Sequence, residues 1–509
     1  VFGHAVGGHS AGMIHTAAWT DNNDQMRRAA YWSPAGTLTV IDLFNRGIAW
    51  DVNSKGWATG FIDFPDFSSQ AFLWKGGSPQ RIAVDAQHQW AVGQGINEWG
   101  EVTGLYRTPD NKHHVFVASG TVGSGKGSPV GYVHAEGDAI NDAGVVAGRM
   151  FTTDFEYANS YGMVWSPQDG FVNVNDLIDN PDGWTVKFLR AIDRDGTMAG
   201  HALKDGIGYP VLLKPVSPVA IQAIQNTQAG VGGTNRALLI ELNAPAPAGG
   251  ALIRLATNDT AATLPATVTV AEGETTASAT LNLPVVTTPR TIGIRATLDY
   301  KAALAEIEVV PPTVQMLSLT PGVGPGGSAR TLRVELNAAA PIGGTTVNLT
   351  KEGLPSLALP PTMIVPAGQF DAEIDVETAA TATPEQGMIF AKTGSVEVSA
   401  QAGIVPPSLA TVDIPVSVHL AETPLSANLT LDGPAPAGGS LVTLSYPNAT
   451  ILAGPASFRI PAGARQGKVA LTTKSIAVDA LARINATLGN ARTDTVRVHF
   501  GRQPATDRR

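Results

Sequence analysis

The residues best suited to catalysis lie in the segment Gly8–Gly12, which reads GHSAG. This matches the G-x-S-x-G motif, in which a strained strand-to-helix turn presents a nucleophilic serine, here Ser10. Only seven residues precede Gly8, so the upstream strands and oxyanion loop of such a site have no place in the chain. Nothing downstream alternates strand and helix. We therefore interpret GHSAG as a glycine-rich connection and expect no hydrolase.

A second candidate is the segment IDRDG, in which Asp193 and Asp195 precede Gly196 with the spacing of a calcium loop. An EF-hand loop also needs a bidentate glutamate at its twelfth position. Counted from Asp193, that position is Lys204. Because the same register elsewhere in the chain predicts a plain turn, we interpret IDRDG as structural.

Histidine can supply zinc ligands, but its spacing here does not favour a zinc site. His113 and His114 are adjacent, and adjacent side chains on a strand point to opposite faces. A zinc site needs three or four converging ligands, whereas His4, His9 and His15 are scattered through a glycine-rich stretch. The chain has no cysteine, which excludes disulfides, thiolate nucleophiles and cysteine metal sites.

Two acidic loops, DNND (Asp21–Asp24) and DFPD (Asp63–Asp66), could hold a calcium ion from several chain segments, although solvated loops are the favoured interpretation. The sequence therefore predicts no catalytic, no cofactor-binding and no metal-binding residue. Calcium is the one cofactor left open.

The tryptophans allow two interpretations. All nine lie between Trp19 and Trp184, and Trp32, Trp74 and Trp165 recur at one repeat position, which predicts a place in the core. The less regular ones could stack on sugar rings from an exposed surface, but core or interface positions are favoured. These are Trp50, Trp57, Trp90, Trp99 and Trp184.

Composition narrows the class of protein. With 509 residues, 43% of them hydrophobic, the chain exceeds one domain and can bury several cores. The 55 glycines, 35 prolines and 15% charged residues favour strands and turns over helices. A net charge of −9 without a basic run argues against nucleic acid as a partner.

Neither a signal peptide nor a stretch of about 20 apolar residues is evident. The chain begins at Val1, in the middle of a repeat, so either it has been processed or its beginning is missing from this sequence. We expect a mature, secreted protein.

Repeats are the elements that must position any site. The segment Ala139–Gly148, AINDAGVVAG, predicts a strand, a turn and a second strand. Related copies occupy Ala49–Gly60, Gly95–Gly104 and Ala191–Gly200, and Gly3–Gly7 matches the second half of a copy. A hydrophobic strand follows each one. Asn or Asp ahead of a glycine suits such a turn, because glycine readily adopts positive φ.

The spacing of the turn glycines predicts the size of the unit. Gly56, Gly100 and Gly144 are 44 residues apart, and Gly196 follows 52 residues after Gly144. A period in the mid-forties with several short strands is the size of a four-stranded propeller blade.

The wording A-x-x-N-x-x-G-x-V-x-G followed by A-F-L-W resembles the HAF-type extracellular repeat of bacterial secreted proteins, over roughly residues 1–214. The resemblance implies an extracellular, propeller-like repeat and assigns no catalytic residue. The copy at Gly95 departs from the usual alanine, and the copy at Ala191 carries Asp193 in place of asparagine. Both changes suit the same turn.

The repeats predict a closure problem. If each blade has strands A to D, the first copy begins at strand B and the last copy ends at strand C before Pro215. Three explanations remain open: further repeats precede Val1, the repeats form an open stack, or a neighbouring chain supplies the missing strand. An unpaired edge of this kind is a template for strand addition.

After Pro215 a second family of repeats begins. Gly250, Gly344 and Gly439 close one motif and are 94 and 95 residues apart. Units of this length with short alternating strands match an immunoglobulin-like (Ig-like) sandwich, and they resemble bacterial Ig-like repeats of cell-surface proteins. We predict a repeat domain over 1–215, sandwiches over 216–311, 312–415 and 416–501, and a tail over 502–509.

These observations predict an all-β protein, with a propeller-like repeat domain followed by three tandem Ig-like sandwiches. We expect a non-enzymatic secreted bacterial protein of the cell surface or extracellular matrix, able to assemble into fibres by strand sharing between chains. The expected partners are other copies of the chain or other surface components, with no nucleic acid and no transmembrane segment. The alternatives are a carbohydrate-binding or carbohydrate-degrading protein that uses the propeller face, and an adhesin with a protein partner.

Overall fold

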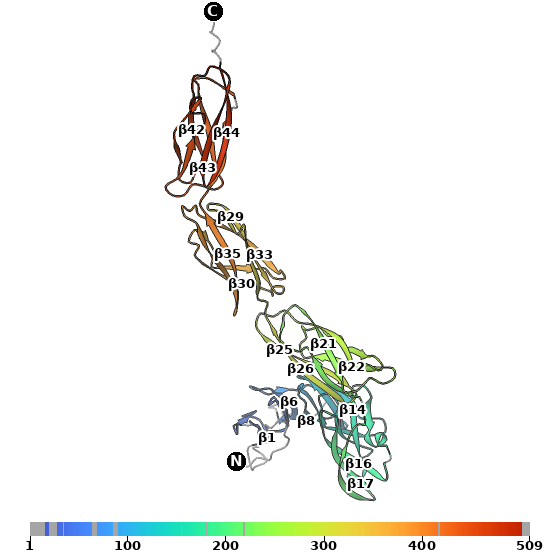
Figure 1. Cartoon of the computed structure of the whole chain (residues 1–509). Coiled ribbons are helices and arrows are strands. Elements are labelled where there is room, and N and C mark those ends of the chain that lie inside the picture. The colour runs from blue at the N-terminus through green and yellow to red at the C-terminus, as the bar shows by residue number, and fades with distance from the viewer. Residues whose placement is uncertain are drawn as a thin grey trace, which may run out of the picture. The chain divides into compact units, whose positions relative to one another are not determined.

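The computed structural model describes residues 16–19, 28–33, 35–63, 69–84, 90–153, 155–179, 181–216, 219–415 and 418–500, with 16–19 and Val418 as backbone only. Figure 1 shows that the described elements are almost all strands. Helical structure in these ranges is limited to two 3-10 turns, η1 (Tyr157–Asn159) and η2 (Val174–Leu177). The predicted all-β fold class is confirmed.

The first part contains five antiparallel sheets, here called A to E, each built from consecutive strands. Sheet A has β1 (Thr16–Trp19), β2 (Ala29–Trp32) and β3 (Leu38–Val40). Sheet B has β4 (Gly47–Val52), β5 (Ala58–Asp63), β6 (Ser69–Trp74) and β7 (Gln80–Arg81). Sheet C has β8 (Trp90–Ile96), β9 (Glu101–Arg107), β10 (His113–Ser119) and β11 (Val122–Gly127). Sheet D has β12 (His134–Ile140), β13 (Val146–Phe151), β14 (Ser160–Ser166) and β15 (Gly170–Asn173), and sheet E has β16 (Trp184–Ile192), β17 (Met198–Lys204) and β18 (Ile207–Leu213).

The predicted turns join the first two strands of sheets B to E. In sheet D the Asn141 N–H donates to Val145 O at 3.0 Å, and the Gly144 N–H donates to Asn141 O at 3.0 Å. Gly144 has a φ of +76°, which is why glycine ends the turn. The same pattern recurs at Gly56, Gly100 and Gly196. Among the described residues β2 pairs with β1 on one side and with β3 on the other, whereas the predicted strand Gly3–Gly7 lies outside them.

Neighbouring sheets share apolar cores. Ile82, which follows sheet B, lies in one buried cluster with Val102 and Phe116 of sheet C. Val174, which follows sheet D, lies in another with Val186 of sheet E. A sheet in this array is therefore buried by the next sheet along the chain rather than by a second sheet of its own.

Complementary side-chain sizes set how closely the sheets approach. A Cβ on Gly137 would lie 2.7 Å from Thr103 Oγ1, and a Cβ on Gly93 would clash with Thr59 Oγ1. At the contact between sheets D and E the matching positions hold Ala147 and Leu189, both fully buried. A larger side chain thus faces a smaller one at each of the three contacts.

Each of the three later segments forms two facing sheets. The first has β19 (Ile221–Gln225), β21 (Asn235–Leu242) and β24 (Thr276–Asn282) in one sheet, facing β20 (Gly230–Val231), β26 (Lys301–Val310), β25 (Arg290–Leu298), β22 (Ala251–Thr257) and β23 (Thr267–Val270). The second has β27 (Val314–Thr320), β29 (Ala329–Leu336), β33 (Asp371–Thr378) and β31 (Leu357–Ala358), facing β28 (Val323–Pro325), β35 (Val396–Val405), β34 (Glu385–Thr393), β30 (Thr345–Glu352) and β32 (Thr362–Val365). The third has β36 (Leu409–Asp413), β38 (Pro424–Leu431), β42 (Gln466–Thr473) and β40 (Leu452–Ala453), facing β37 (Val418–Leu420), β44 (Asn490–His499), β43 (Ala480–Leu488), β39 (Ser440–Ser445) and β41 (Ser457–Ile460).

This strand order is that of an Ig-like sandwich. The short second strand crosses to the other sheet and pairs in parallel with the last strand, as β28 does with β35 and β37 with β44. The second and third sandwiches have separate cores, with Leu332 and Ile389 in one and Val442 and Ile484 in the other. The predicted Ig-like sandwiches are confirmed.

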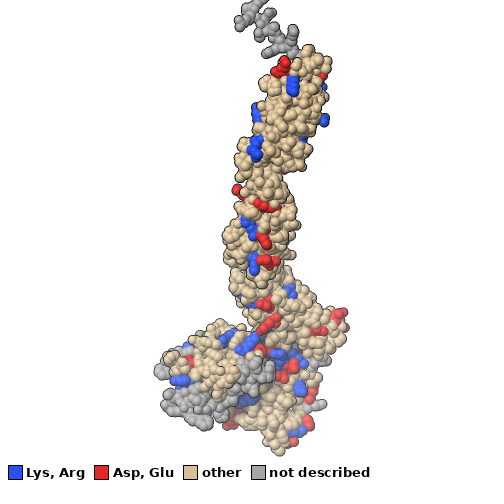
Figure 2. Space-filling model, turned by 60° about the vertical axis from the view of Figure 1, so that its left-hand side comes forward, with Lys and Arg blue, Asp and Glu red and all other residues tan. Residues whose placement is uncertain are grey.

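The chain divides into two compact units. One contains residues 1–229, 235–282 and 291–308, which are the repeat sheets and most of the first sandwich. The other contains residues 230–234, 283–290 and 309–509, which include the second and third sandwiches. Figure 2 shows acidic and basic residues scattered over a mainly uncharged surface on the face in view. No helix among the described residues is long and apolar enough to cross a membrane.

Candidate functional site

The repeat turns are connected by a ladder of asparagine side chains. Asn53 Nδ2 donates to Asn97 O at 2.9 Å, Asn97 Nδ2 donates to Asn141 O at 2.9 Å, and Asn141 Nδ2 donates to Asp193 O at 3.1 Å. The side-chain oxygen of each asparagine accepts N–H groups of its own turn. One side chain therefore closes its own turn and also fixes the next sheet.

The ladder stops at Asp193. Its Oδ1 accepts the Thr197 N–H at 2.7 Å and so closes the turn as an asparagine would. A carboxylate has no N–H with which to reach a further carbonyl. The other N–H of Asn141 donates to Tyr300 O at 2.9 Å, in the turn between β25 and β26. The first sandwich therefore covers the end of the ladder.

Further polar contacts attach the same sandwich to the turns. Arg295 binds Glu101 through two N–H···O contacts of 2.7 and 3.2 Å, and its guanidinium lies 5.0 Å from the Trp99 ring centre. Lys55 Nζ lies 3.2 Å from Glu306 Oε1. Arginine held by a bidentate carboxylate and an aromatic face is a well-oriented contact. The repeat array and the first sandwich thus hold one another in place.

The other notable feature of the array is its last edge. Sheets B, C and D have four strands, whereas sheet E has three within the described residues, so the outer edge of β18 is unpaired there. Ile207, Tyr209 and Leu212 on β18 are 59, 40 and 69% exposed. Sheet A likewise has three strands in the described range. The predicted absence of one strand at each end of the array stays a prediction, because residues 1–15 lie outside the described range.

Register identifies which part of β18 is missing its partner. Val211 pairs with Gly200, as Met163 pairs with Gly148 in sheet D. In sheet D the fourth strand pairs with Met163–Ser166, so the vacant segment in sheet E begins at Val211. Pro210 lies just before this segment. Because proline has no N–H to donate, it weakens the pairing of a further strand with the part of β18 that precedes Val211.

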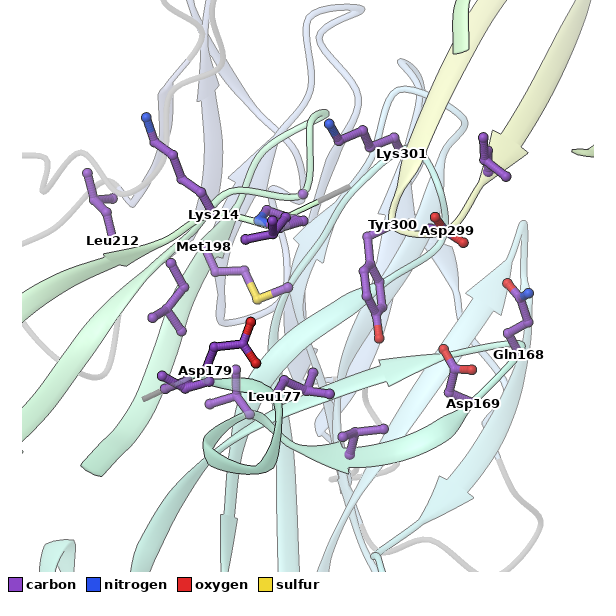
Figure 3. Close-up of a pocket in the computed structure, with 18 residues that line it drawn as sticks. Gln168, Asp169, Leu177, Asp179, Met198, Leu212, Lys214, Asp299, Tyr300 and Lys301 are labelled. Atoms are coloured by element: carbon purple, nitrogen blue, oxygen red, sulfur yellow. The ribbon is translucent and has the colours of Figure 1, made fainter. Parts of the chain in front are cut away.

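A pocket lies beside this segment, as Figure 3 shows. Its volume is about 790 Å³, and its lining combines the end of β18 with η2 and the turn that carries Tyr300. Most of the lining is apolar, including Val174, Leu177, Met198 and Leu213. A concave apolar site of this size can take a ligand or an inserted side chain.

The charged groups of the pocket are carboxylates and lysines. Asp169, Asp179 and Asp299 line it together with Lys214 and Lys301. In Figure 3 the Tyr300 ring projects into the pocket between Leu177 and Asp169. Burial raises the pKa of the Tyr300 phenol, and the negative charges of Asp169 and Asp299 raise it further. Tyr300 is therefore a neutral hydrogen-bonding group at this position.

Only some of the other candidates considered from the sequence lie in the described residues. Ser10, His4, His9, His15 and the DNND loop lie outside the described residues, as does most of DFPD. His113 contacts Glu136, whereas His114 contacts Ser128, so the adjacent histidines do point to opposite sides. The described ranges contain no group of three or more His, Asp or Glu that could hold a metal ion.

The irregular tryptophans also separate. Trp57 packs against the core between sheets B and C, and Trp99 packs under Arg295 at the sandwich-facing turns. Trp90 and Trp184 begin β8 and β16, at the opposite ends of their sheets. Trp57 and Trp99 therefore do not share a face with Trp90 and Trp184. Sequence reasoning missed the ladder, although the change from asparagine to Asp193 was visible.

Comparisons with known proteins give limited information. No family model and no curated protein matches the chain. Among solved structures, the adhesin InvE of Yersinia pseudotuberculosis is 16% identical, covers 36% of this chain and has a TM-score of 0.21. The chain spans 58% of that structure's length. Invasin, a bacterial integrin-binding protein, is 12% identical over 74% of this chain and 77% of its own, with a TM-score of 0.23. A titin fragment of domains I67–I69 is 9% identical over 57% of this chain and 100% of its own, with a TM-score of 0.20. At such scores the likenesses assign no function, and the class of this protein, an all-β chain of meander sheets and Ig-like sandwiches, rests on its own topology.

Proposed function

We propose that this chain is a non-enzymatic, extracellular structural protein of the bacterial surface or matrix, which assembles by strand addition at β18. The proposal includes the finer predictions: an HAF-type, propeller-like repeat domain over residues 1–215, sandwiches over 216–311, 312–415 and 416–501, and a tail over 502–509. Two families of tandem repeat occupy the chain, and the described site offers apolar surface and an open edge rather than converging catalytic groups.

The observation that carries the proposal is the edge of sheet E. From Val211 onward the main chain of β18 pairs with β17 on one side and has no ladder partner on its outer side among the described residues. The exposed side chain of Leu212 lies beside a mainly apolar pocket. A strand added here would gain main-chain hydrogen bonds and could insert a side chain into the pocket, which are the two elements of β-strand addition.

Sheet A suggests the donor, because β1 pairs only with β2 among the described residues. Sheet A lacks a first strand where sheet E lacks a fourth, both within the described residues. If β1 of one copy pairs with β18 of another, each copy uses two different surfaces. Such head-to-tail contacts build a filament when the rotation between copies does not close into a ring. The favoured occupant of the edge is therefore a second copy of this chain.

The test combines negative-stain microscopy with mass measurement in solution for the natural chain and for Leu212→Lys. A lysine at an edge blocks further pairing, so the variant is expected to need at least about tenfold more protein for assembly, equivalent to ~1.4 kcal/mol. Leu481→Lys is the matched control, because Leu481 is 60% exposed on β43 of the third sandwich.

Filaments that disappear in Leu212→Lys and persist in Leu481→Lys would support the proposal. Single particles of 52.8 kDa for the natural chain across the accessible concentration range would contradict it. Filaments that survive Leu212→Lys unchanged would place the contact elsewhere on the molecule.

A further inference from the structure

The pocket beside β18 lies between sheets D and E, on the face of sheet E that packs against sheet D. Val174 of η2 and Met198 of β17 line it, and both belong to the apolar core that these two sheets share. Leu213 of β18 also lines the pocket and packs against this core. The pocket is therefore a continuation of that core, at the place where sheet E has no fourth strand among the described residues.

Register shows which side chain of a fourth strand would point into the pocket. In sheet D the fourth strand places Phe171 opposite Trp165, and both side chains pack against the core shared with sheet C. Leu213 is the counterpart of Trp165, because Leu213 pairs with Met198 as Trp165 pairs with Val146. Side chains directly opposite one another in adjacent strands lie on the same face of a sheet. The counterpart of Phe171 would therefore lie opposite Leu213 and point toward sheet D.

The contact between sheets B and C fills the same position with backbone. In sheet C the fourth strand places Gly123 opposite Ala118, which is the counterpart of Trp165 in that sheet. A Cβ on Gly123 would lie 3.2 Å from Ala83 O and 3.2 Å from Val84 Cα, so the segment after sheet B leaves no room for a side chain there. The contact between sheets D and E instead leaves a pocket of about 790 Å³. A fourth strand in sheet E would therefore need a large side chain at this position.

We propose that the strand donated by a second copy is selected by one large apolar side chain, which lies opposite Leu213 and is buried in the pocket. This inference rests on the proposed strand addition at β18. Val211 and Leu213 pack against the core shared with sheet D, whereas Leu212 between them is 69% exposed and faces away. Main-chain hydrogen bonds are open to any sequence, and side-chain pockets give a strand addition its specificity. One position of the donor is therefore selective, and its neighbours are not.

The test uses a fluorescent peptide of residues 168–175, QDGFVNVN, which carries the fourth strand of sheet D. Fluorescence polarisation measures its binding to the full chain. Phe171→Ala in the peptide removes the ring from the pocket and should weaken binding at least about tenfold, equivalent to ~1.4 kcal/mol. Val172→Ala is the matched peptide control and should have a smaller effect, because Val172 would lie opposite Leu212, on the face turned away from sheet D.

A variant of the chain tests the pocket without altering the edge. Leu177 lines the pocket from η2 and is 50% exposed, so Leu177→Lys adds a charge to the pocket wall and leaves the main chain of β18 intact (Figure 3). Because burial against a charge is unfavourable, peptide affinity should fall about tenfold. Ile207→Lys is the matched control and should leave affinity unchanged, since Ile207 is 59% exposed at the start of β18 and does not line the pocket.

The outcomes separate this inference from the proposed function. Equal losses for the two peptide substitutions, full affinity in Leu177→Lys, or no peptide binding at all would overturn selection at the pocket. Filaments that depend on Leu212 would still support strand addition in each of these cases. Binding that prefers Phe171, in a chain that forms no filaments, would support selection at the pocket and contradict a second copy as the donor.

Discussion

The repeat sheets and the second and third Ig-like sandwiches are both made of antiparallel strands, but they bury their apolar faces differently. Each sandwich closes a core between its own two sheets, as Leu332 and Ile389 do in the second. In the repeat array a core such as that around Phe116 combines residues of neighbouring sheets. A sandwich therefore supplies its own packing partner, whereas a repeat sheet depends on the next one and, at the end, on the first sandwich.

The largest expected effect comes from truncating one buried side chain in each kind of core, the core between two repeat sheets and the core of a sandwich. Phe116→Ala removes a fully buried ring at the contact of sheets B and C and should cost about 3–5 kcal/mol. Because the sheets depend on one another, the whole repeat array should melt at lower temperature. Leu332→Ala should cost about 2–5 kcal/mol and lower one sandwich transition.

Differential scanning calorimetry on both variants distinguishes these outcomes. A Phe116→Ala variant in which part of the repeat array melts at the natural temperature would contradict the interdependence of the sheets. A Leu332→Ala variant that lowers the transition of the repeat array would contradict the independence of the sandwich.

The titration of Asp138 is expected to change the free energy of unfolding by about 3 kcal/mol. Burial raises the pKa of this carboxyl to about 6, against the lowering influence of Arg190 and Arg149 and with the raising influence of Glu136. One pKa unit corresponds to about 1.4 kcal/mol. Because the folded-state pKa is above the usual 3.8, this contribution to stability is complete below about pH 4 and is lost as pH rises through about 6.

Asp138→Asn tests this sign. Thermal melts between pH 4 and 6.5 measure how the melting temperature changes with pH. In the variant, the part of this change that is due to Asp138 should be absent. The pKa of Glu136 is lowered by His113 and Arg149, so its contribution has the opposite sign and remains in the variant. An unchanged slope in Asp138→Asn would contradict the prediction.

The ladder should contribute less. Asn141→Asp keeps the oxygen that closes its own turn but removes both N–H groups that reach Asp193 O and Tyr300 O. Leaving these acceptors unsatisfied should cost about 1–3 kcal/mol. Asp193→Asn is the control and should change stability little. Urea unfolding of both variants gives the comparison, and equal destabilisation would argue against a directional ladder.

An effect of the same size as that of the ladder concerns the fit between sheets. Gly137→Ala would bring a methyl group against Thr103 Oγ1 and should cost about 1–3 kcal/mol. Thr103→Ala should recover part of that loss, since a small residue would then face a small one. A double-mutant cycle by urea unfolding measures the coupling, and strict additivity would contradict the packing argument.

The sequence predicted the strands, turns and Ig-like sandwiches well, because their spacing and alternation are local patterns. The asparagine turns also follow from the period, whereas the absence of one strand at each end of the array stays a prediction. The contact of Asn141 with Tyr300 could not be predicted, since it joins residues 159 positions apart from different families of repeat. The pocket could not be predicted either, because its lining combines the end of β18 with η2 and with the turn that carries Tyr300. Closure of the array into a propeller stays a prediction.

The asparagine ladder also bears on how many sheets such an array can contain. Each asparagine side chain in the ladder donates to the turn of the next sheet along the chain. A sheet whose turn carries asparagine can therefore be followed by another copy of itself. A sheet with aspartate at that position offers its neighbour no such donor. Duplication of the segment around Asn97 or Asn141 would therefore lengthen the array without loss of contacts, whereas duplication after Asp193 would not. The single exchange of an amide for a carboxylate at Asp193 therefore marks the last sheet of the array, because it removes the donor that a further repeat would need.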